Sequence, residues 1–91
     1  MCDTGEDFLA QRRQLGLAAA QGDANAQCKL GGMHYNGTGG PEDFAEARRW
    51  FELSAAQGHA EAQCRLGGMH YRGQGGPEDF AEARRWYGLA A

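Results

Sequence analysis

The sequence lacks an excess of basic residues, a long apolar run and the cysteine density of a disulfide-stabilised domain. Nine basic residues stand against twelve acidic ones, which gives a formal net charge of −3. A nucleic-acid partner is therefore not expected, because phosphate binding needs a basic surface. No apolar stretch approaches the ~20 residues that cross a bilayer, and no signal peptide is evident. We therefore expect no membrane partner and favour a cytoplasmic location.

Cysteine is scarce, and catalytic motifs are missing. The three cysteines, Cys2, Cys28 and Cys64, are an odd count that fits a reducing compartment. No nucleophile–base–acid set or paired carboxylates stand out. The glycine runs GTGG and GQGG lack the Lys-Ser/Thr of a phosphate-binding loop. We therefore expect neither an enzyme nor a bound cofactor.

Glycine is abundant, with 15 residues, and its distribution reveals an internal repeat. The letters GGPEDFAEARRW occur at 39–50 and again at 75–86, and a shift of 36 makes 25 of 33 residues identical between 23–55 and 59–91. The same shift matches 9 of 16 residues between 7–22 and 43–58. A period of this length is typical of a solenoid. We divide the chain into a flexible N-terminal segment (1–6), a half repeat of one helix (7–22), a full repeat (23–58) and a truncated repeat (59–91).

Each repeat is predicted to form two helices. Asp23 is a good N-cap, and the glycines after residue 36 can supply the positive φ that ends a helix. The second helix starts either with Pro41 at its first position or with Asp43 as its cap. We therefore predict an all-α fold, a right-handed α-solenoid of antiparallel helix pairs, with helices near 7–20, 23–36, 42–56, 59–72 and 78–91. Leu30, Phe44 and Trp50 are predicted to be buried.

With these residues identified, the chain resembles the Sel-1-like repeat family, a relative of tetratricopeptide repeats. Positions that match the family pattern in both copies are Ala24/Ala60, Ala26/Ala62, Leu30/Leu66, Gly31/Gly67, Gly37/Gly73, Asp43/Asp79, Ala47/Ala83 and Trp50/Trp86. His34 and His70 depart from it, since the family usually has Tyr there. The resemblance implies an adaptor or scaffold that binds a partner protein or peptide.

The differences between the two copies suggest where a partner binds. In the first helix the differing pairs are Asn25/Glu61, Lys29/Arg65 and Asn36/Arg72. Spacings of 4 and 7 place them on one helix face, and first helices commonly line the concave surface of such solenoids. We therefore predict partner contact there. The alternative is that exposed positions simply vary.

A second hypothesis, from another class, is a small redox- or metal-responsive module that uses Cys28, Cys64, His34 and His70. Within one helix Cys28 and His34 diverge by about 120°, so a shared site would need ligands from two repeats. Two ligands alone make a poor zinc site. Some Sel-1-like proteins join the helices of a repeat through two cysteines, but each repeat here has one.

Two further expectations concern the second helices. The arginine pairs at 12–13, 48–49 and 84–85 could grip an acidic peptide or phosphates, but local partners such as Glu46 and Glu52 favour a self-neutralised, solvated face. The last repeat carries Phe80, Ala83 and Trp86 with no helix after them, whereas the half repeat looks more like a cap. The C-terminal face of the last repeat is therefore predicted to expose apolar side chains and to allow self-association.

Overall fold

The computed structural model describes residues 4–90, which form five α-helices and no strand. These are α1 (Thr4–Ala20), α2 (Ala24–Asn36), α3 (Phe44–Ala56), α4 (Ala60–Arg72) and α5 (Phe80–Ala90). Cys2 and the rest of residues 1–3 lie outside the described residues, whereas residues 4–6 of the predicted N-terminal segment belong to α1, which begins three residues earlier than predicted. None of the described helices is long and apolar enough to cross a membrane.

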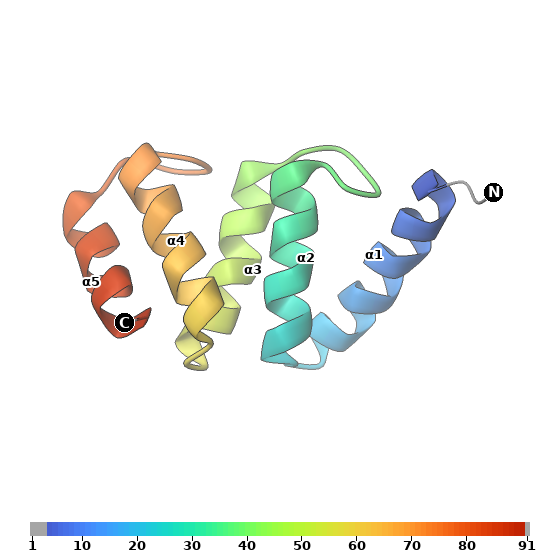
Figure 1. Ribbon diagram of the computed structural model, residues 1–91, viewed down its shortest axis with the longest axis horizontal. Helices are drawn as coiled ribbons and strands as arrows, with labels where there is room; N and C mark the ends of the chain where they lie inside the picture. Colours follow the sequence, from blue (N-terminus) through green and yellow to red (C-terminus); the bar gives the residue numbers. More distant parts are fainter. Residues whose placement is uncertain (1–3, 91) are drawn as a thin grey trace.

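The helices stand side by side in chain order and form an elongated body of 45 × 23 × 20 Å (Figure 1). The glycine loops that join α2 to α3 and α4 to α5 lie along one edge, and the shorter turns lie along the opposite edge (Figure 1). Each helix packs mainly on the helices before and after it in the chain. The predicted all-α solenoid of antiparallel helix pairs is confirmed.

Aspartates fix the starts of three helices. The Asp23 carboxylate accepts a hydrogen bond from the amide of Ala26, 3.1 Å away, and so caps α2 as predicted. Asp43 does the same for Glu46 at 3.1 Å, and Asp79 for Glu82 at 3.1 Å. Because these aspartates are the caps, α3 and α5 begin two residues later than the predicted starts at 42 and 78. The alternative with Pro41 at the first helical position was wrong.

Glycines in the left-handed region end the first helices. Gly37 has φ 72° and Gly73 has φ 68°, and the amide of each bonds to the carbonyl of the methionine four residues earlier. This conformation costs a residue with a side chain more than it costs glycine. The predicted helix end at the NGTGG run is confirmed.

The buried core differs in part from the prediction. Leu30 is buried, as expected, but Trp50 and Phe44 are only partly buried. The aromatic side chain at the centre is Phe51, 1% exposed, which packs with Leu66 and Met69. Trp50 lies at the edge because its indole nitrogen needs a hydrogen-bond partner, and it donates to the Glu46 carboxylate at 3.1 Å.

The paired glycines inside the first helices have different roles. A Cβ on Gly31 would lie 2.9 Å from the Phe51 ring, so the close approach of α3 explains this glycine. Gly67 meets Tyr87 in the same way, at 3.0 Å. A Cβ on Gly32, in contrast, would have no neighbouring atom within 4 Å, and close packing does not account for this glycine.

The first arginines of two pairs, Arg12 and Arg48, link one repeat to the next, which corrects the prediction of a solvated face for them; Arg84, the first arginine of the third pair, is exposed. Arg48 is 7% exposed, and its guanidinium donates to the carbonyls of Met69 (3.1 Å) and Gln74 (3.0 Å) rather than to Glu52. Arg12 donates to the carbonyls of Met33 and Thr38 at 3.0 and 3.1 Å. Met33 and Met69 lie in the last turn of α2 and α4, where the carbonyls carry partial negative charge, so a nearby arginine stabilises the helix end.

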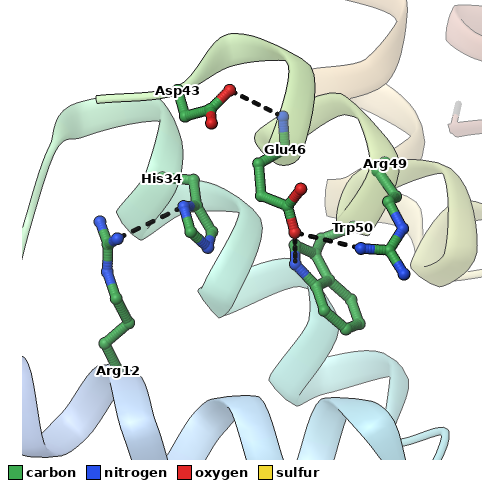
Figure 2. Close-up of polar contacts among 6 residues, drawn as sticks. All are labelled: Arg12, His34, Asp43, Glu46, Arg49 and Trp50. Atoms are coloured by element: carbon green, nitrogen blue, oxygen red, sulfur yellow. Dashed lines mark hydrogen bonds and ion pairs between the residues drawn. The ribbon is translucent and has the colours of Figure 1, made fainter. Parts of the chain in front are cut away.

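The second arginines behave as predicted. Arg49 pairs with Glu46 at 3.1 Å on the surface (Figure 2), and Arg85 pairs with Glu82 at 3.2 Å. Because Arg12 and Arg48 are bound to main-chain carbonyls, the arginine pairs do not form the continuous basic ladder that could bind phosphates.

Candidate functional site

All six residues predicted to contact a partner are exposed, three on α2 and three on α4. The structure brings four of them to two pockets related by the 36-residue repeat. Lys29 and Asn36 line a pocket of about 270 Å³ between α1 and α2. Arg65 and Arg72 line a pocket of about 230 Å³ that also involves α2, α3 and α5. We call these the α2 pocket and the α4 pocket.

Asn25 and Glu61 lie outside the pockets and bind neighbouring side chains. The Asn25 side-chain oxygen is 3.1 Å from Nε2 of His59, across the repeat boundary. Glu61 accepts a hydrogen bond from Nε of Arg65 at 3.2 Å, one helical turn away. These two predicted residues therefore border the candidate site rather than form it.

The α4 pocket combines buried apolar side chains with polar and charged ones. Phe51 and Met69 are each 1% exposed and form the buried apolar part of its lining. Tyr35, Cys64, Arg65, Arg72 and Tyr87 complete the lining, and no acidic side chain is among the lining residues. The pocket can therefore accept a ligand group that has both an apolar part and a negative charge.

Two hydrogen-bond donors of the α4 pocket lie next to Gly68, which has no side chain to displace them. A Cβ at this position would lie 3.3 Å from Nη1 of Arg72 and 3.3 Å from the Tyr87 hydroxyl. The equivalent Gly32 in the α2 pocket has nothing within 4 Å. The two pockets thus share their framework but differ in the donors that they offer.

The cysteines and histidines do not come together as a reactive site. Burial, followed by the negative charge of Glu61, raises the pKa of the Cys28 thiol to about 11, so the thiolate needed for redox or metal chemistry is disfavoured. Cys64 is exposed, and both thiols are free. Among residues 4–90, no group of three or more His, Cys, Asp or Glu is placed to hold a metal ion.

The two histidines have different surroundings. Nδ1 of His34 lies 3.4 Å from Nη1 of Arg12, which reaches it from α1 (Figure 2). Burial, and then the Arg12 charge, lowers the pKa of His34. Nδ1 of His70 is buried and finds no hydrogen-bond partner within the described part of the chain. Neither imidazole is directed to a shared ligand set with the cysteines.

The C-terminal face exposes large apolar side chains, as the sequence predicted for Phe80. Phe80 and Tyr71 are both 57% exposed, and with Ala83, Arg84 and Tyr87 they line a third pocket of about 280 Å³. Trp86, in contrast, is partly buried. The half repeat does not form the polar cap that was expected, because Leu17 is 70% exposed and Phe8 and Leu9 about 40%.

Sequence reasoning missed the residues that complete the α4 pocket from other helices. Tyr35 comes from α2 and Tyr87 from α5, and the repeat pattern alone does not indicate that they meet. One signal was available, because Phe51 in the first repeat becomes Tyr87 in the second. That change places a hydroxyl group at the position that is fully apolar in the preceding unit.

Comparison with known proteins gives consistent results. The family model described as Sel1 repeat matches residues 24–59 and 60–91. Among solved structures, a protective antigen present in uropathogenic Escherichia coli strains and displaying an SLR fold is 37% identical, with a TM-score of 0.86; the match covers 87% of this chain and 17% of that one. A Sel1 repeat protein from Oxalobacter formigenes is 36% identical, with a TM-score of 0.86, over 88% of this chain and 33% of that one.

A third solved structure, Helicobacter pylori cysteine rich protein B, shows the same fold at 20% identity. Its TM-score is 0.83, and the match covers 87% of this chain and 59% of that one. No curated protein matches the sequence. The chain therefore spans between 17% and 59% of the length of these three structures.

Proposed function

The chain belongs to the Sel1 repeat family, and we propose that it is a protein-interaction module that binds a partner protein or peptide on the face formed by its first helices, α2 and α4. Members of this family generally serve as protein-interaction modules. The finer proposal concerns the face, which we take to be the concave one. Its predicted contact residues are Asn25, Lys29, Asn36, Glu61, Arg65 and Arg72.

The observation that carries the proposal is the pair of equivalent pockets on this face. Both are built on the same framework positions, including Gly32 and Gly68 and the methionines that follow them. Lys29 and Asn36 are exposed and are replaced by the exposed Arg65 and Arg72, whereas the buried positions of α2 carry the same residue types in α4. Two equivalent pockets with different polar groups can bind successive side chains of one extended partner. Ligand sites are usually concave pockets of this kind.

Charge reversal on this face tests the proposal. The variant with both Lys29→Glu and Arg65→Glu is compared with wild type for retention of proteins from a lysate of the source organism, read by mass spectrometry. We expect the specifically retained proteins to be lost while the melting temperature is unchanged, because both side chains are exposed. Arg13→Glu is the matched control, since Arg13 is exposed and lines none of the three pockets. Retention by the double variant equal to wild type would contradict the choice of face.

We also propose that the chain can self-associate through its C-terminal face. Tyr71, Phe80 and Leu89 are each more than half exposed, and exposed apolar patches commonly mark interaction surfaces. Light scattering over a concentration series should show a mass above that of one chain, and Phe80→Glu should restore the monomer. A wild-type monomer at the highest concentration would rule this interaction out.

A further inference from the structure

The α4 pocket presents an excess of hydrogen-bond donors and positive charge. Arg65 and Arg72 are its two charged lining residues, and Tyr87 adds a hydroxyl group. Within residues 4–90, no hydrogen bond engages the Arg72 guanidinium or the Tyr87 hydroxyl, although both lie 3.3 Å from the Cβ position of Gly68. Tyr35 differs, because its hydroxyl already donates to the side-chain oxygen of Gln74 at 3.0 Å.

Arg65 is restrained only by an exposed ion pair. Its Nε donates to Glu61, and the two side chains are 47% and 62% exposed. Pairs of this kind contribute little to stability, because water competes for both partners. The guanidinium can therefore exchange Glu61 for the carboxylate of a ligand with small loss.

We infer that the α4 pocket binds an acidic side chain, Asp or Glu, of the partner peptide, with Arg72, Arg65 and Tyr87 as the groups that receive its carboxylate. Arginine is suited to this because its planar guanidinium can donate two parallel hydrogen bonds to a carboxylate. Phe51 and Met69 give the same pocket an apolar part, which the methylene groups of the acidic side chain can contact. This inference rests on the proposed function, since it names the partner chemistry of the same face.

The occupant is a side chain rather than a chain terminus because a second recess of the same design lies one repeat away. The α2 pocket also carries a cation, Lys29, so a peptide that continues along the face meets positive charge again. At the position of Arg72 it has Asn36, and no side chain approaches Gly32. The α2 pocket is therefore the weaker of the two for a carboxylate.

The repeat supplies three matched substitutions, in which the new residue already occurs at the equivalent position of the other helix. Arg72→Asn and Arg65→Lys convert the α4 pocket to the residues of the α2 pocket. Glu61→Asn introduces the residue found at Asn25 and releases Arg65 from its internal carboxylate. Gly68→Ala places a methyl group between the two donors, with Gly32→Ala as its control.

The experiment selects peptides from a random 12-residue library displayed on phage, with the full chain as the target. The selected peptide is then measured by fluorescence anisotropy, together with versions in which each Asp or Glu is replaced by Asn or Gln. A version with an amidated C-terminus separates side-chain carboxylates from the terminal one. We expect selected peptides to carry an Asp or Glu next to apolar residues, and one neutral replacement to weaken binding by about tenfold or more.

The variants give the decisive readout. Arg72→Asn and Gly68→Ala should each weaken the acidic peptide about tenfold while barely changing its neutral version, and Glu61→Asn should strengthen it. If the selected peptides lack acids, or if Arg72→Asn leaves affinity unchanged, the inference is wrong. If such peptides nevertheless fail to bind the variant with both Lys29→Glu and Arg65→Glu, the proposed binding face is supported and only the carboxylate inference fails. If the library yields no peptide that binds this face, both are overturned.

Discussion

The Arg48 guanidinium in α3 donates a hydrogen bond, 3.1 Å long, to the main-chain carbonyl of Met69 at the end of α4. Arg48 is almost fully buried, yet within the described residues it forms no ion pair with a carboxylate. Its guanidinium is bound by carbonyls in the last turn of α4 and in the loop that follows, and Arg12 makes the equivalent contacts one repeat earlier. These hydrogen bonds are one of the links between successive repeats.

Replacing Arg48 with Ala should therefore destabilise the fold by about 2–4 kcal/mol, since carbonyls at a buried helix end lose a charged donor. The matched Arg49→Ala variant removes an arginine whose ion pair is exposed, and it should cost less than about 1 kcal/mol. Urea unfolding curves give both values. Equal losses for the two variants would show that Arg48 does not join the repeats.

Phe51→Ala should be more damaging than Trp50→Ala. The Phe51 ring is fully buried against Gly31 and the core cluster, so its removal should cost about 3–5 kcal/mol. Trp50→Ala should lower the free energy of unfolding less, because Trp50 is only partly buried: its indole packs against the cluster that contains Leu30, and its nitrogen donates to Glu46 at the surface. Thermal unfolding of the two variants makes the comparison, and the reverse order would contradict the core described above.

The adjacent glycines of α2 should respond in opposite directions to alanine. Gly31→Ala places a methyl group 2.9 Å from the Phe51 ring and should destabilise by about 1–3 kcal/mol. Gly32→Ala meets no atom within 4 Å and should stabilise by about 0.5–1 kcal/mol through higher helix propensity. Denaturant midpoints measure both. A loss of stability in Gly32→Ala would reveal a packing role that the structure does not show.

The stability of the fold should fall as His34 becomes protonated. Burial and Arg12 lower the pKa of His34 below 6.5, its value without these effects, so the unfolded chain binds the proton more readily. The contribution of His34 is complete above about 6.5 and is lost progressively as the pH falls towards the lowered pKa. His34→Gln should flatten this part of the pH dependence in unfolding measured between about pH 7.5 and 5.5. An unchanged slope would contradict the assignment.

Local sequence signals predicted the helices well because capping and left-handed glycines act over a few residues. Asp23 and Gly37 could be identified from the sequence for this reason. The start of α3 was less certain, since Pro41 and Asp43 both offered a plausible beginning, and only the capping bond to Glu46 distinguishes them.

Contacts between repeats could not be predicted in the same way. Arg48 and Arg49 are adjacent and identical in type, yet one is buried and the other pairs on the surface. Their difference depends on the position of the next repeat, which periodicity does not give. The α4 pocket has the same origin, because its lining comes from four helices that meet only in the folded chain.

The footprint of a bound partner peptide on the chain would test the proposed binding face without relying on any substitution. Amide chemical shifts from nuclear magnetic resonance, recorded as the selected peptide is added, report each residue of the five helices. We expect the largest chemical-shift changes on α2 and α4, at residues that line the two pockets: Lys29, Asn36, Arg65, Gly68 and Arg72. Changes centred instead on the outer sides of α3 and α5, with the first helices unaffected, would contradict a partner site on α2 and α4.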